Sequence, residues 1–176
     1  MVRPIILVLG AVPAVAAAVV AASLLSQPEI PFSAAVSDDN IEIEYTVHDL
    51  RVVSFGVTER VGADRTQILT IQRDGDVRLI VTEGGFPQPT VQSSLTEEEV
   101  IRLIALIKET GFMALPEDTF PVRDDAVEYR RHAVKVTLNG AVTKVTWPEQ
   151  NATDGFIPPI ITQVETKLGD VLERAR

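Results

Sequence analysis

The sequence predicts an α+β protein in which an N-terminal transmembrane helix precedes an antiparallel sheet of hairpins packed against two amphipathic helices. Three observations predict it. Residues 4–25 are almost entirely apolar, residues 95–112 and 158–171 place apolar side chains at helical spacing, and other segments alternate apolar and polar residues between turn signals. Because an amphipathic helix must bury its apolar face, we expect both helices to pack against the sheet.

The first element is predicted to be a membrane span. Residues 4–25 contain a single polar side chain, Ser23, and as a helix they would extend about 33 Å, enough to cross the apolar core of a bilayer. Residues 1–28 are therefore expected to be a membrane anchor, or a cleaved signal segment, since small residues near 19–23 suit a cleavage site. With Arg3 before the span, the bulk of the chain is expected outside the cytoplasm, tethered or, after cleavage, secreted.

The composition after this segment limits the classes of partner. Residues 29–40 combine a proline with small and acidic side chains, so we expect a linker leading to an extracytoplasmic domain at 41–176. The formal net charge is −9, which argues against nucleic acid as a partner because binding to phosphates needs a basic surface. No cysteine is present, so disulfides, thiol catalysis and thiolate metal sites are excluded.

Four strands are predicted in the first part of the domain. Residues 41–47 alternate apolar and polar side chains as a half-buried strand does, and the other three predicted strands are 52–57, 67–72 and 77–82. Residues 58–66 are mostly polar and are expected to form a loop. Asp74-Gly75-Asp76 is a turn signal and not a calcium loop, because the further oxygen ligands and the closing glutamate are missing.

The clearest helix signal lies at 95–112. Thr96 and Glu99 have the spacing of a capping box, and Gly111 suits the left-handed position after the helix. Its apolar face is expected to comprise Val100, Leu103, Ile104 and Ile107. The spacing therefore specifies the beginning, the end and the buried side of this helix.

A second hairpin and a second helix follow. Residues 131–138 and 141–147 flank Asn139-Gly140, the preferred pair for a two-residue type I′ turn. Pro158 and Pro159 are expected to open the last helix. Its apolar face would comprise Ile161, Val164, Leu168 and Val171.

Neither histidine belongs to a recognisable catalytic or metal-binding motif. His48 and His132 each follow a glutamate by four residues, Glu44 and Glu128, but in a strand that spacing separates the side chains by roughly 13 Å. His132 follows Arg130 and Arg131 in a predicted strand and is therefore expected to be a solvated strand residue. The HExxH, GxSxG, SxxK and GxxxxGK patterns are all absent. The sequence thus predicts a protein that is not an enzyme, with no cofactor and no metal.

Two weaker signals lie after the first helix. Five carboxylates fall close together at Glu117, Asp118, Asp124, Asp125 and Glu128. They could hold a hard cation or supply an acid and base pair, but nothing fixes their spacing, so a solvated acidic loop is expected. Asn151-Ala152-Thr153 matches the acceptor pattern for N-glycosylation, which is used only outside the cytoplasm.

The aromatic residues divide into two groups. Trp147 and Phe112 have apolar neighbours and are expected to pack in the core. Phe86 follows two glycines and precedes Pro87. We expect it to be packed, the alternative being an exposed aromatic that anchors a binding partner.

A family resemblance covers about half of the chain, from 77 to about 147 and loosely on to the C-terminal helix. It is carried by the strand VRLIVT, by Glu83-Gly84-Gly85-Phe86, by the helix opening LTEEE at 95–99, by Gly111-Phe112 followed by Leu115-Pro116, and by the later hairpin. In this order of features the chain resembles emfourin, a small protein inhibitor of thermolysin-like metalloproteases, and related small domains of unknown function. The resemblance implies an α+β fold and makes Gly84, Gly85 and Phe86 the candidate binding residues.

The expected function is therefore that of a membrane-tethered extracytoplasmic domain that binds a protein partner and is not an enzyme. The alternative, implied by the resemblance, is inhibition of a secreted thermolysin-like metalloprotease.

Overall fold

The computed structural model describes residues 38–55, 58–116 and 120–176. The predicted membrane span at 4–25 and most of the predicted linker lie outside these residues. Among the helices that are described, none has both the length and the apolar character needed to cross a membrane.

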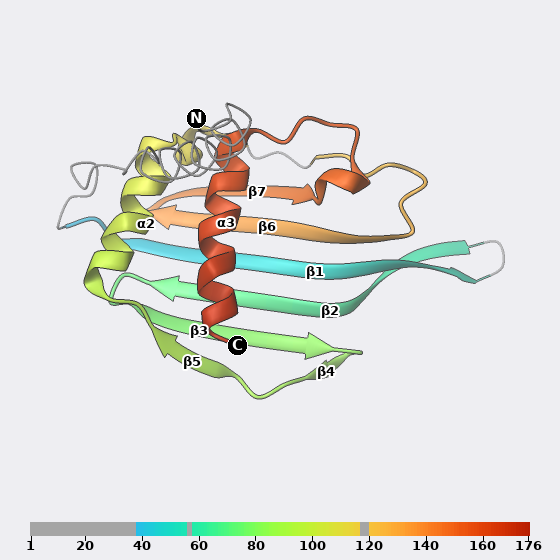
Figure 1. The fold of residues 1–176 in the computed structure, drawn as a ribbon, viewed down its shortest axis with the longest axis horizontal. Helices are drawn as coiled ribbons and strands as arrows, with labels where there is room; N and C mark the ends of the chain where they lie inside the picture. Colours follow the sequence, from blue (N-terminus) through green and yellow to red (C-terminus); the bar gives the residue numbers. More distant parts are fainter. Residues whose placement is uncertain (1–37, 56–57, 117–119) are drawn as a thin grey trace, which may run out of the picture. The chain divides into compact units, whose positions relative to one another are not determined.

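The domain is built on one antiparallel sheet (Figure 1), whose strands follow the order β4-β3-β2-β1-β6-β7, with β5 also paired to β3. The strands are β1 (Ile41–Phe55), β2 (Thr58–Gln72), β3 (Asp76–Glu83), β4 (Phe86–Pro87), β5 (Val91–Ser94), β6 (Glu128–Leu138) and β7 (Ala141–Pro148). The first strand is thus central, because the last hairpin to be synthesised joins the sheet beside it.

Two helices, α2 (Glu97–Glu109) and α3 (Pro159–Arg174), cover one face of this sheet (Figure 1). The strand side chains facing them are apolar, and β1, β3, β6, β7 and the inner part of β2 largely alternate buried and more exposed residues. The most deeply buried side chains are Trp147, Phe112, Ile43, Leu69, Ile71, Leu79, Ile104, Ile107, Ile161 and Leu168. The α+β fold and the packing predicted for Trp147 and Phe112 are therefore confirmed.

The signals at the helix ends act as predicted. The Thr96 hydroxyl accepts a hydrogen bond from the Glu99 N–H at 3.2 Å, and the Thr96 N–H donates to the Glu99 carboxylate at 2.8 Å, which completes the capping box. After α2, Gly111 has a φ of 72° and donates its N–H to the Lys108 carbonyl. Pro159 is the first residue of α3.

One end of the sheet is fixed by a buried carboxylate. Asp39 is 5 % exposed; its carboxylate accepts hydrogen bonds from Lys108 Nζ at 2.9 Å and from Asn139 Nδ2 at 2.8 Å, and its carbonyl accepts one from Arg73 Nε. We call these four residues the Asp39 cluster. It ties the start of the domain to α2, to the turn between β2 and β3, and to the turn between β6 and β7. In the latter turn Asn139 and Gly140 both have positive φ, as the type I′ prediction requires.

The prediction of a loop at 58–66 was wrong. These residues belong to β2, and β1 runs without interruption to Phe55, so the two strands form one long hairpin. Its outer part, residues 51–55 of β1 and 58–64 of β2, is here called the arm. Val52 pairs with Val61, and Arg51 forms an ion pair with Asp64 at 3.3 Å. Cross-strand pairs thus stabilise a segment whose polarity suggested a loop.

Two further boundaries differ from expectation. No strand was predicted between residue 82 and the helix, but this segment forms β4 and then β5, both of which pair with β3. At the other end of the chain, β6 begins at Glu128 and not at 131, because Glu128 pairs with Arg51 of the arm.

Candidate functional site

The candidate residues Gly84 and Gly85 form the two-residue turn between β3 and β4. Their φ values are 56° and 83°, a combination that glycine adopts without strain. Glu83 pairs with Phe86 across the turn, and the Gly84 N–H donates to the Asp64 carbonyl of β2 at 2.8 Å. The turn is therefore held on two sides by backbone hydrogen bonds.

Phe86 is presented to solvent by this turn. Its exposed fraction is 74 %, so the expectation of a packed side chain was wrong. The physical reason is its position at the margin of the sheet, because β4 pairs only with β3 among the described residues. Pro87 completes this two-residue strand. An aromatic ring thus stands exposed on a constrained backbone.

The turn lies at the end of the sheet opposite to the Asp39 cluster. β3 begins at Asp76, beside that cluster's end of the sheet, and reaches Glu83 after eight residues. At about 3.3 Å per residue this is a separation of roughly 25 Å. Phe86 is therefore placed far from the point where the chain enters the domain.

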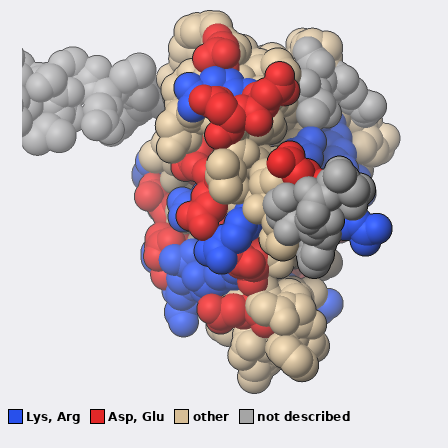
Figure 2. Space-filling view, turned by 90° about the vertical axis from the view of Figure 1, so that its right-hand side faces the viewer, with Lys and Arg blue, Asp and Glu red and all other residues tan. Residues whose placement is uncertain are grey.

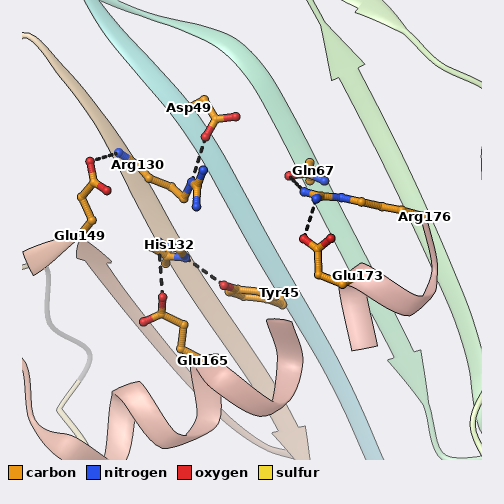
Figure 3. A network of polar contacts seen from close by, with 9 residues as sticks. All are labelled: Tyr45, Asp49, Gln67, Arg130, His132, Glu149, Glu165, Glu173 and Arg176. Atoms are coloured by element: carbon orange, nitrogen blue, oxygen red, sulfur yellow. Dashed lines mark hydrogen bonds and ion pairs between the residues drawn. The ribbon is translucent and has the colours of Figure 1, made fainter. Parts of the chain in front are cut away.

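The structure also contains a buried polar group that the sequence did not indicate (Figure 3). His132 is 5 % exposed and lies between the rings of Tyr45 and Trp147, with centroid distances of 6.0 and 5.7 Å and nearly parallel planes. The Tyr45 hydroxyl is 2.9 Å from His132 Nδ1, and Glu165 of α3 accepts a hydrogen bond from Trp147 Nε1 at 3.0 Å. The prediction of a solvated His132 was therefore wrong; we call these four residues the His132 stack.

Burial controls the charges in the His132 stack. It lowers the pKa of His132 to about 4, with a further lowering by Arg130 and a smaller opposing effect of Asp49. Burial also raises the pKa of Glu165, against the effect of its hydrogen bond from Trp147. His132 is thus neutral at pH 7, and its Nε2, 3.6 Å from the Glu165 carboxylate, does not form a charged pair with it.

The geometry of the His132 stack is suited to holding α3 on the sheet. Its members come from β1, β6, β7 and α3, and Tyr45 and His132 are 3 % and 5 % exposed. A substrate would have to displace α3 to reach either ring. Only Glu165 is partly open to solvent, with 31 % of its side chain exposed.

A hollow of about 410 Å³ lies elsewhere, over β2, β3 and β5. Its polar lining includes Thr70, Gln72, Asp76, Arg78, Gln92 and Ser94. The register pairs Thr70 with Arg78 and Arg78 with Gln92, so these side chains share the face of the sheet opposite to the buried Val77 and Leu79. The hollow is separate from the His132 stack.

The acidic crossover is only partly within the described residues, since Glu117 and Asp118 fall outside them. Asp124, Asp125 and Glu128 are exposed. In the described ranges no three histidine or acidic side chains gather closely enough to hold a metal ion. Asn151 is exposed in the short helix η3 (Gln150–Ala152), while Thr153 is buried and its hydroxyl accepts the Gly155 N–H.

The charges near the arm are mixed in sign. Figure 2 shows acidic and basic side chains next to one another on the side of the molecule at the right of Figure 1. Arg51 contacts Glu128 at 2.8 Å, and Arg130 contacts Asp49 at 3.1 Å. These partners offset each other's charge at the surface.

Comparison of the sequence with models of known protein families gave no match. Comparison with curated proteins gave no match either.

Proposed function

We propose that residues 41–176 form an extracytoplasmic module that binds a protein partner, is not an enzyme, and is tethered to a membrane by residues 4–25. The single observation that carries this is the 74 % exposed ring of Phe86 on the Gly84–Gly85 turn. Aromatic side chains are enriched among the residues that dominate binding energy. A protein partner can bury this solvent-exposed ring, which is held beside a constrained turn.

The backbone around Phe86 favours binding because it is already ordered. The turn is bonded to β2 through the Gly84 N–H, and the chain beyond β4 is bonded back to β3 through the Gln88 N–H and the Val81 carbonyl, at 2.8 Å in both cases. Association therefore costs less conformational entropy than it would with an aromatic on a mobile loop.

The position of the Gly84–Gly85 turn is compatible with a membrane tether at residues 4–25. The predicted linker enters the domain at the Asp39 cluster, and the Gly84–Gly85 turn lies at the opposite end of β3. A partner in the extracytoplasmic space can thus reach Phe86 at the end of the domain farthest from its entry point.

The test uses the full chain in intact cells, with a photo-crosslinking amino acid placed at position 86 or, as a matched control, at position 142. Val142 is also an exposed apolar strand residue, 49 % exposed, but it lies on β7 next to the Asn139–Gly140 turn. We expect one recurrent protein adduct from position 86 and none from position 142. Competition by unlabelled wild-type chain, but not by Phe86→Ala, should remove the adduct.

Equal capture from both positions, or competition that does not depend on Phe86, would contradict a binding role for this turn. Recovery of no adduct from position 86 would also count against it.

A second candidate function is inhibition of a secreted thermolysin-like metalloprotease. The observation that favours it is the projection of Gly84-Gly85-Phe86, the residues that carry the resemblance to emfourin, as an exposed hairpin turn. The purified chain should then slow peptide hydrolysis by thermolysin, and Phe86→Ala should relieve the inhibition while Val142→Ala does not. Full protease activity at saturating concentrations of the wild-type chain would remove this function.

The membrane location has its own test. Mass spectrometry of washed membranes should find the chain with an intact N-terminus if residues 4–25 anchor it. A new N-terminus near residues 21–26 in the soluble fraction would instead establish a secreted protein. A glycan on Asn151 would independently place the domain outside the cytoplasm.

A further inference from the structure

The edges of the sheet differ in how they are protected. An unpaired strand edge can recruit another chain, and folded proteins commonly block it with a covering segment or with proline. On the β7 edge a neighbouring segment contacts the strand, because the Phe120 N–H donates to the Thr146 carbonyl at 3.1 Å. At the edge formed by β4 and β5, Pro87 belongs to β4 and Pro89 lies between the two strands. A covering contact is thus present on one outer edge of the sheet, and proline on the other.

The arm has an edge without such protection. The pairing of β2 with β3 ends at Arg65, opposite Glu83, and the Gly84 N–H occupies the carbonyl of Asp64. Beyond Asp64, residues 59–63 of β2 pair only with β1 within the described part of the chain. They include neither proline nor lysine. We call this stretch the free edge, because among the described residues no strand pairs with its outer side.

Next to the free edge lies a row of three valines. Val52 pairs with Val61, and the Val52 N–H donates to the Val127 carbonyl at 2.8 Å. Val52 and Val61 are directly opposed, so their side chains share one face of the arm, and Val127, the residue before β6, is bonded to Val52 on its other side. Val61 is 55 % and Val127 is 60 % exposed. The row therefore runs across the arm and stops, uncovered, at the free edge.

We propose that two copies of this chain associate through the free edge, antiparallel, about a two-fold axis that passes through Val61. The two valine rows then join into one apolar row of six side chains, and Val61 is buried against its own copy. Pairing also gives hydrogen-bond partners to the backbone groups of the arm, which beyond Val52 has only two strands among the described residues, an arrangement that is marginal in water. This association is independent of Phe86 and of its partner.

The register follows from strand geometry. Backbone N–H and C=O groups of successive residues point to alternate edges of a strand. A strand that pairs antiparallel with its own copy must therefore place a residue on the axis, and the free edge offers Arg60, Val61 or Gly62. An axis at Arg60 would set two guanidinium groups side by side. An axis at Gly62 would place Arg60 opposite Asp64 of the second copy, but the Asp64 carbonyl already accepts a hydrogen bond from the Gly84 N–H.

An axis at Val61 meets neither difficulty. It places Arg60 opposite Gly62 of the second copy and Glu59 opposite Ala63, so no like charges are paired. The two strands of the arm cross one another in Figure 1, which shows that the arm twists relative to the rest of the sheet. A second arm on the free edge is accordingly directed away from the line of β3.

The absence of cysteine from the chain permits a clean crosslinking test on the full-length protein in the membranes or medium of expressing cells. Val61→Cys places two thiols on the axis, where opposed Cβ atoms lie about 4.5–5.5 Å apart, close to the separation that a disulfide requires. We expect a covalent dimer after mild oxidation. Val142→Cys, on an equally apolar and similarly exposed strand position, should remain monomeric.

A mixed experiment tests the register. Ala63→Cys alone should crosslink poorly, because the two Ala63 residues are four residues out of register, roughly 13 Å apart. Co-expressed Glu59→Cys and Ala63→Cys chains, carrying different tags, should form a disulfide with each other. Efficient crosslinking of Ala63→Cys with itself would overturn the axis at Val61.

A charge on the axis tests association without a disulfide. Val61→Arg should convert the dimer to a monomer in light scattering of the purified full chain in non-ionic detergent, whereas Val142→Arg should not. Fluorescence of the buried Trp147 reports whether each variant is folded. A wild-type chain that is monomeric, or a folded Val61→Arg chain that is as dimeric as the wild type, would overturn the association.

Discussion

Acidification should destabilise this fold through His132, and the size of the effect can be worked out. The unfolded chain binds a proton at His132 with a pKa near 6.5, whereas burial in the folded chain lowers that pKa to about 4. Above pH 6.5 both states are neutral and stability is complete. As the pH falls from 6.5 to 4, His132 binds a proton in the unfolded state but not in the folded state, so the free energy of unfolding declines.

A shift of this size corresponds to about 3 kcal/mol, since each pKa unit is worth about 1.4 kcal/mol. Glu165 acts with the opposite sign. Because its folded pKa is raised, the folded state takes up a proton first and gains stability as the pH falls through that raised value. The observed decline is therefore the difference between the two effects, and a variant is needed to separate them.

The variant His132→Phe keeps an aromatic ring between Tyr45 and Trp147 but cannot titrate. Loss of the Tyr45 hydrogen bond lowers the stability of the variant by about 1–3 kcal/mol at every pH. Glu165 and His48 are present in both the wild type and the variant, so their pH-dependent contributions largely cancel in the difference between the two stability curves. The assay is urea unfolding of the full chain in non-ionic detergent, followed by Trp147 fluorescence, from about pH 7.5 to about pH 4. We expect the wild type to lose about 3 kcal/mol more than the variant over this range. Parallel stability curves would refute a buried neutral histidine.

Three further predictions concern the free energy of unfolding, measured in the same way. Gly85→Ala should cost about 1–2 kcal/mol, because this residue has a positive φ. Gly75→Ala should cost more, because this residue also has a positive φ and a Cβ there would lie 2.4 Å from the Leu95 carbonyl oxygen. Equal losses of stability from the two substitutions would contradict this. Thr96→Ala should cost about 1 kcal/mol through loss of the cap; an unchanged stability would mean that the capping box is dispensable. Asp39→Ala should cost about 1–3 kcal/mol, because it removes the buried carboxylate that accepts the hydrogen bonds of Lys108 and Asn139, and a neutral substitution would show that the Asp39 cluster adds nothing.

Local signals in the sequence were sufficient wherever the determining residues are neighbours. The capping box of Thr96 and Glu99, the Asn139–Gly140 turn and the proline start of α3 each depend on a few adjacent residues, and all three are confirmed. The alternation in the strands likewise predicted which residues face the core. The class of fold could therefore be predicted before its topology.

Features that depend on distant partners could not be predicted. His132 is buried because Tyr45, 87 residues away, supplies a hydrogen bond and α3 covers it, while its sequence neighbours Arg130 and Arg131 suggested exposure. The β2 part of the arm was predicted to be a loop because its residues are polar, yet Arg51 and Asp64 meet across the arm. Phe86 was expected to be packed because it is aromatic, but no described element covers it. In each case tertiary contacts, or their absence, override the local pattern.

The place of β1 at the centre of the sheet has a consequence for folding during synthesis. β2 follows immediately and can pair with it, but the residue of β6 that meets Tyr45 is synthesised 87 residues later, on the order of ten seconds at usual elongation rates. During that interval the other edge of β1 has no native partner, and the nascent chain is vulnerable to aggregation. Glu42 and Glu44 are exposed on β1, and their negative charge discourages pairing of this strand with other chains until the last hairpin has been synthesised.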